Sequence, residues 1–99
     1  MATANYKLTL DPLIDTIFVF EIGGHYVDPD ELEGSLDNVF ISEAGIRIRL
    51  ELGGIERQAW NLEVSIENDE ETLHTIPEII SGKIGRGGGS WFDRTCPLV

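Results

Sequence analysis

Residues 46–67 have the sequence IRIRLELGGIERQAWNLEVSIE, which contains two segments of alternating apolar and polar residues. Residues 46–52 carry isoleucine or leucine at every second position, and residues 60–67 carry tryptophan, leucine, valine and isoleucine in the same way. A period of two is typical of a β-strand with one face in the core and the other in solvent. Because Gly53-Gly54 favours a turn, the stretch predicts an antiparallel β-hairpin.

The positions of the apolar residues determine the expected register of this hairpin. A two-residue loop at 53–54 would turn Trp60 to the face opposite Ile48. A three-residue loop at 53–55, or a one-residue bulge between residues 56 and 59, instead pairs Ile48 with Trp60. We therefore expect these two side chains to be buried neighbours on one face of one sheet.

Further strand signals precede this stretch. Residues 6–10 alternate, and residues 17–20 are apolar at every position, which is typical of a central strand. Gly23-Gly24 permits a tight turn, after which residues 25–27 are expected to resume pairing. Residues 39–41 predict one more short strand. The chain is therefore rich in β-structure.

Helical signals are few. Residues 28–31, Asp-Pro-Asp-Glu, combine a capping carboxylate, a proline suited to the first helical position and further acids, so a short helical turn is predicted over residues 29–33. Residues 75–82 fit either a second helical turn or an edge segment interrupted by Pro77. The expected fold is mainly β: a small antiparallel sheet or partly closed barrel with one or two short helical turns.

Composition indicates one globular domain of 99 residues, 41% of them hydrophobic and 25% charged. The longest uncharged apolar stretch, residues 16–20, is far shorter than the ~20 residues that cross a bilayer. Residues 1–7 lack the basic and apolar regions of a secretory signal, and the single cysteine, Cys96, fits a reducing compartment. We expect a cytoplasmic protein without membrane contact.

Charge divides the chain into an acidic β-rich domain, residues 1–82, and a C-terminal segment, residues 83–99. The first holds 17 acids and four bases, a balance of −13, and the second holds three bases and one acid, a balance of +2. An acidic surface repels phosphates, so direct nucleic-acid binding is not expected. It attracts a basic protein, including the cationic groove of a nucleic-acid-binding protein, which a phage-type inhibitor would occupy. The alternative is that the charge serves solubility alone.

The C-terminal segment combines glycine with large apolar residues. Five of the eight residues 82–89 are glycine, which is typical of a flexible linker, and residues 90–99 are apolar and aromatic. Such side chains need cover, from the protein's own core, from a neighbouring subunit or from another protein. We interpret residues 83–99 as a glycine-hinged tail that engages a protein partner. The residues expected to make the contact are Trp91, Phe92, Arg94, Leu98 and Val99.

Residues that could carry chemistry are sparse. His25, His74 and Cys96 are not spaced as metal ligands, and residues 28–34 are out of step with a calcium loop. A nucleophile–base pair of Cys96 and His74 lacks a recognisable orienting group. The sequence therefore predicts a non-enzymatic protein that binds no metal or cofactor.

One family resemblance involves the C-terminal third. Residues 71–74, Glu-Thr-Leu-His, followed by an apolar segment and by Gly-Arg-Gly-Gly-Gly at 85–89, resemble the end of a ubiquitin-like modifier precursor. The resemblance implies that residues 90–99 are an extension removed after Gly88 or Gly89, because glycines pass through the narrow channels of processing enzymes. The same boundary resembles the double-glycine junction of a ribosomal peptide precursor. The residues expected at the processing site are Gly87, Gly88, Gly89 and Ser90.

Overall fold

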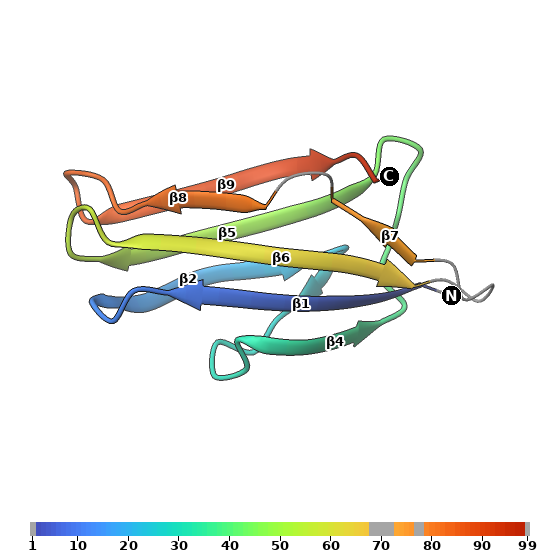
Figure 1. Ribbon diagram of the computed structural model, residues 1–99, viewed down its shortest axis with the longest axis horizontal. Helices are drawn as coiled ribbons and strands as arrows, with labels where there is room; N and C mark the ends of the chain where they lie inside the picture. Colours follow the sequence, from blue (N-terminus) through green and yellow to red (C-terminus); the bar gives the residue numbers. More distant parts are fainter. Residues whose placement is uncertain (1, 68–72, 77–78, 99) are drawn as a thin grey trace.

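Two antiparallel sheets pack face to face in the computed structural model, which describes residues 2–67, 73–76 and 79–98 (Figure 1). These described residues contain no helix, and hence none that could span a membrane. The strands are β1 (Thr3–Leu10), β2 (Ile14–Ile22), β3 (His25–Tyr26), β4 (Glu33–Asp37), β5 (Ile46–Gly54), β6 (Ala59–Glu67), β7 (Leu73–Thr75), β8 (Ile80–Lys83) and β9 (Gly89–Cys96).

The first sheet, sheet A, has the order β4-β1-β6, and β7 and β8 share the far side of β6. The second, sheet B, has the order β3-β2-β5-β9. The two sheets do not close into a barrel, so the architecture is an open sandwich. The predicted mainly β fold is confirmed, but the partly closed barrel is not formed.

The predicted hairpin of residues 46–67 is wrong, because its two strands lie in different sheets. β5 pairs with β2 and β9, whereas β6 pairs with β1, β7 and β8. Ile48 and Trp60 are both buried, yet they meet the core from opposite layers. Alternation specifies which face of a strand is buried, and a facing sheet satisfies that requirement as well as a neighbouring strand does.

The core lies between the layers and is built from the inward side chains of both long strands. All eight apolar residues that alternate along β5 and β6 are buried. They are Ile46, Ile48, Leu50, Leu52, Trp60, Leu62, Val64 and Ile66. Tyr6 and Leu8 of β1 and Phe20 and Ile22 of β2 extend this layer, which confirms the strand predicted over residues 6–10.

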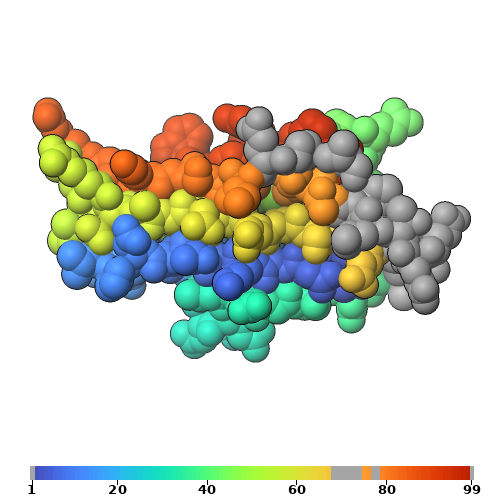
Figure 2. All heavy atoms as spheres, viewed as in Figure 1, coloured from blue at the N-terminus to red at the C-terminus, as the bar shows by residue number. Residues whose placement is uncertain are grey.

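Three connections between the sheets gather at one end of the long molecule (Figures 1 and 2). They join β1 to β2, β5 to β6 and β8 to β9, and each carries the chain from one layer to the other. The Ile55 N–H donates to the Leu13 carbonyl at 3.1 Å, and the Gly54 N–H donates to the Gly88 carbonyl at 3.0 Å. Hydrogen bonds thus link the three connections into one rigid end.

The helical turn predicted over residues 29–33 is not formed. The Glu31 N–H donates to the Asp28 carbonyl at 2.9 Å, which closes a single turn. Helix propagation stops there because the Leu32 carbonyl accepts the Leu8 N–H of β1 at 2.7 Å, and β4 follows directly. The residue types that begin a helix also form isolated turns, and pairing with β1 selects the turn here.

Two other expectations are resolved by backbone pairing. The strand predicted over residues 39–41 is wrong, because Val39 and Phe40 donate to the carbonyls of Ala2 and Gly23 as loop residues. Of residues 75–82, Thr75 ends β7 and residues 80–82 belong to β8, and Ile76 and Ile79 are in neither helix nor strand. The described part is therefore not helical, and Pro77 lies outside the described residues. Pairing does resume after the Gly23-Gly24 turn, as β3.

Trp60 is the largest side chain in the core and depends on a glycine. Its indole lies on Gly82 of β8, where an added Cβ would be 2.7 Å from indole Cζ2. Its Nε1 donates to the Ser90 hydroxyl of β9 at 3.0 Å, so Trp60 joins β6, β8 and β9. Only a residue without a side chain leaves this space for the ring.

Replacing Gly82 by alanine should therefore lower the free energy of unfolding by roughly 1–3 kcal/mol, because the methyl group displaces the indole. Chemical denaturation measures the change. Gly87→Ala is the matched control, since an added Cβ there has no atom within 4 Å. Equal stability of the two variants would contradict the close packing of Trp60 on β8.

Candidate functional site

The glycine-rich segment is a structured turn in the sandwich. Gly88 donates its N–H to the Gly85 carbonyl at 3.0 Å, and Gly85 donates to the Gly89 carbonyl at 2.9 Å. Gly88 has φ of +83°, a backbone conformation that glycine adopts without strain. The expected boundary after residue 82 falls inside β8, so residues 83–99 are not a separate hinged tail in this structure.

β9 is an integral strand of sheet B. It pairs with β5 over eight consecutive residues, from Gly53 opposite Gly89 to Ile46 opposite Cys96, without a shift in register. The C-terminal apolar residues were expected to be covered by the protein's own core, by a neighbouring subunit or by another protein. In the structure their strand, β9, belongs to the protein's own domain. The predicted processing residues, 87–89 and Ser90, are the end of this turn and the start of β9.

The predicted partner-binding residues are divided between two faces of β9. Trp91 points to solvent and is 76% exposed, whereas Phe92 is half-buried and packs against the core. The exposed Arg94 guanidinium lies 5.3 Å from the centre of the Phe92 ring, and Leu98 also packs against the core. Val99 lies outside the described residues. Trp91 alone therefore belongs to a solvent-facing surface of sheet B.

The residues around Trp91 follow from the sheet register. Glu51 of β5 is opposite both Trp91 of β9 and Val19 of β2, so these three share the outer face. Phe18 lies at a register shift beside Val19, is 67% exposed and covers Gly53, where an added Cβ would be 2.8 Å from its ring. An aromatic side chain from β2 thus extends over β5 toward the β9 side of the face.

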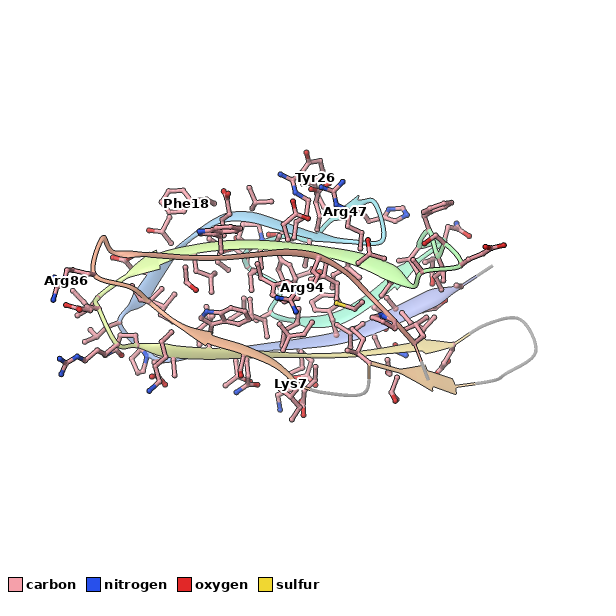
Figure 3. The ribbon with its side chains drawn as sticks, turned by 90° about the horizontal axis from the view of Figure 1, so that it is seen from above. Lys7, Phe18, Tyr26, Arg47, Arg86 and Arg94 are labelled. Atoms are coloured by element: carbon pink, nitrogen blue, oxygen red, sulfur yellow. The ribbon has the colours of Figure 1, made fainter. Side chains whose placement is uncertain are left out.

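Tyr26 completes this surface at the edge of the sheet. It is opposite Glu21 in the β2–β3 pair and is 76% exposed. Figure 3 shows Phe18, Tyr26 and Arg47 projecting from sheet B away from sheet A. We name the set Phe18, Val19, Tyr26 and Trp91 the aromatic face.

An ion-pair row crosses the same surface from β2 to β9. The Arg49 Nη1 is 2.6 Å from the Glu21 Oε2, and the Arg49 Nε is 3.6 Å from the Asp93 Oδ2. Arg47 donates to both carboxylate oxygens of Asp93, at 3.1 Å each. Two parallel N–H···O bonds fix the guanidinium and the carboxylate in one plane. The ion-pair row therefore links side chains of β2, β5 and β9 across the outer face.

The electrostatics of the row favour the ionised state. Hydrogen bonding from Arg47, assisted by the charges of Arg47 and Arg49, holds the pKa of Asp93 below its ordinary value. The same bond raises the pKa of the Arg47 guanidinium. Both groups thus remain charged at neutral pH, and the row persists there.

Sequence reasoning missed Phe18 and Tyr26. The first was expected in a central strand covered on both faces, and it does lie in an interior strand of sheet B, but the outer face is open. The sequence of β5 did indicate that this face is exposed, because its outward positions are Arg47, Arg49 and Glu51. Charged residues at alternate positions of the neighbouring strand indicate that the whole outer face meets water.

Reactive groups are not gathered elsewhere in the described chain. Within that part, no three His, Cys, Asp or Glu side chains lie together as metal ligands. His25 Nε2 is 2.8 Å from the Asn38 carbonyl oxygen, and burial raises the pKa of the Cys96 thiol. The side chain of His74 lies outside the described part.

No protein-family model, curated protein or solved structure matches the chain. The proposed function therefore rests on the geometry of the surface.

Ending the chain after Gly89, as the predicted processing would, should abolish cooperative folding. The truncation removes one of the two neighbours of β5 and the Ser90 hydroxyl that accepts from Trp60. A domain of this size has roughly 5–15 kcal/mol of stability, and the loss of an edge strand that pairs with β5 over eight residues takes a large part of it. Circular dichroism during heating measures the transition. A truncated protein that melts like the full chain would contradict the structural role of β9 and favour processing.

Proposed function

We propose that this protein is a non-catalytic binding module that docks a basic partner protein against the aromatic face. One observation carries the proposal. Trp91 and Phe18, 76% and 67% exposed, lie on the same solvent face of one sheet. Single exposed apolar residues are ordinary on protein surfaces, but several large aromatic side chains on one face are typical of contact surfaces.

Burial of the exposed aromatic side chains would contribute favourable energy to binding. Each aromatic side chain can bury roughly 150–250 Å² of area, and apolar burial contributes about 25 cal/mol per Å². Trp91 and Phe18 together therefore supply several kcal/mol before the costs of association. Tryptophan, tyrosine and arginine are the residues that most often dominate binding energy at interfaces.

The surface is also ordered before any partner arrives. Trp91 and Phe18 are attached to strands that pair with β5 on either side. The ion-pair row crosses the same face and gives Arg47 and Arg49 hydrogen-bond partners within the sheet. Since less conformational entropy is lost on binding, more of the contact energy appears as affinity.

The negative charge of this protein indicates that its partner is positively charged. The aromatic face is bordered by the exposed Glu51, and residues 1–82 carry the −13 balance. A basic protein surface approaches such a protein faster and with better complementarity than an acidic one. The cationic groove of a nucleic-acid-binding protein is one surface of this kind, in which case the protein acts as an inhibitor.

Replacing Trp91 or Phe18 by serine should weaken binding by roughly 30-fold or more, which corresponds to the ~2 kcal/mol of a dominant contact residue. The partner is captured with the tagged wild-type protein, identified by mass spectrometry, produced separately and titrated calorimetrically against each variant. Melting temperatures should stay close to that of the wild type, because both side chains are exposed.

Phe40→Ser is the matched control for this experiment. Phe40 is as exposed as the other two, at 73%, but belongs to the loop after β4. It should bind like the wild type. Equal weakening by all three substitutions, or none by Trp91→Ser and Phe18→Ser, would exclude the aromatic face as the contact.

Association should also slow steeply as salt rises through the range in which the Debye length falls from ~10 Å to ~3 Å. Stopped-flow measurements of the association rate test this, with Glu51→Gln as a variant that removes one charge beside Trp91. A rate independent of salt would leave solubility as the role of the acidic surface.

A further inference from the structure

β9 has a free edge whose backbone groups can be assigned from the register. The Gly54 N–H donates to the Gly88 carbonyl, so this pair is hydrogen-bonded across the β5–β9 ladder. In an antiparallel pair the bonding direction alternates along each strand. Residues 90, 92, 94 and 96 therefore bond to β5, while Trp91, Asp93 and Thr95 direct their N–H and C=O groups away from the sheet.

These outward groups are suited to accept another strand. Among the described residues, no backbone group outside the β5–β9 ladder bonds to Trp91, Asp93 or Thr95. β9 is eight residues long, regular in register and free of proline. By contrast, β3 at the other edge of sheet B has only two residues. An extended, unpaired edge strand is a template for a strand from another chain.

A groove beside this edge can hold the side chains of such a strand. It has a volume of about 490 Å³ and lies between the β8 side of sheet A and β9. Figure 3 looks onto this edge and shows Arg94 between the two layers. The groove is lined by Ile76, Ile79 and Ile80 on one side and by Phe92, Arg94 and Cys96 on the other.

Arg94 selects which strand can bind. It is on the inward-facing side of β9, stacked on Phe92 and exposed through the open edge. Among the described residues no carboxylate forms an ion pair with Arg94. A strand added at this edge covers the guanidinium, and covering a charge without a carboxylate partner is energetically costly. Inward-pointing charges protect natural edge strands from indiscriminate pairing in this way. If the added strand carries a carboxylate opposite Arg94, the two charges pair and the energetic cost of covering the guanidinium is removed.

A second copy of this chain does not meet that requirement at β9. The inward side of β9 carries Ser90, Phe92, Arg94 and Cys96, none of which is an acid, whereas Asp93 faces outward and bonds to Arg47. An antiparallel pair of β9 strands therefore leaves Arg94 without a carboxylate, which a segment with an inward-facing acid supplies.

We propose that the free edge of β9 binds an extended acidic peptide segment of a partner protein, with apolar side chains in the groove and a carboxylate on Arg94. This contact uses the backbone of Trp91, whereas the aromatic face uses its side chain, and it does not depend on the proposed function. The segment extends sheet B by one strand and pairs with Trp91, Asp93 and Thr95.

The probe is the synthetic peptide acetyl-Val-Thr-Glu-Thr-Val-amide, which reads the same in both directions and so places glutamate opposite Arg94 in either strand polarity. It is titrated to millimolar concentration into the ¹⁵N-labelled full chain. Amide shifts should be largest at Trp91, Asp93 and Thr95 and saturate with peptide. The peptide with lysine in place of glutamate should bind at least tenfold more weakly, and Arg94→Glu should reverse that preference.

Thr95→Pro tests the backbone pairing. It removes an N–H that points away from β5, so the β5–β9 ladder keeps its bonds, and Thr95→Val is the matched control that retains the N–H. Proline should abolish the peptide-induced shifts, and valine should leave them unchanged. If Thr95→Pro does not fold, the charge reversal at Arg94 decides alone.

Three results would overturn the proposal. The first is the absence of saturable shifts at the β9 amides. The second is equal affinity for the glutamate and lysine peptides with the wild-type protein. The third is a concentration-dependent dimer in sedimentation equilibrium that Thr95→Pro abolishes, which would assign the edge to a second copy.

Discussion

The mutual burial of β5 and β6 is the constraint on which the rest of the structure depends. Each strand has one apolar face, and a connection of four residues, 55–58, takes the chain from one layer to the other. Because each strand covers the other across the core, each must find its hydrogen-bonding neighbours elsewhere in the chain. β1 and β2 supply those neighbours on one side, and β8 and β9 supply them on the other. The sheet order follows from this one arrangement.

Local patterns predicted burial well and pairing poorly, for a physical reason. Alternation in residues 46–67 identified all eight core side chains, because burial depends on the face of one strand. It could not identify the neighbouring strand, since a partner across the sheet and a partner across the core satisfy the same pattern. The glycine-rich residues 85–89 were ambiguous in the same way, because linkers and tight turns share a composition. Only the hydrogen bonds of Gly85 and Gly88 show that this segment is a turn and not a linker.

The candidate site was predicted in part. Trp91 was identified from its own character, as a large apolar residue in a segment that had no evident cover. Phe18 and Tyr26 were missed because their exposure depends on the far side of sheet B having no further layer, which is a property of the whole fold. The C-terminal segment suggested both burial and binding because β9, which it forms, has one inward and one outward face. Its inward residues, such as Phe92, complete the core, and its outward residues, such as Trp91, remain available.

The crossing of the chain between layers at each of the three gathered connections has a consequence for the order of folding. Thr3 pairs with Glu67, and Ile46 pairs with Cys96, so strand neighbours are distant in sequence. Neither sheet can be completed from a contiguous part of the chain, and such topologies fold slowly because loop closure precedes the stabilising contacts. During synthesis, β5 remains an open edge above a partly covered core until residues 89–96 have left the ribosome. The nascent chain is most exposed to aggregation in that interval.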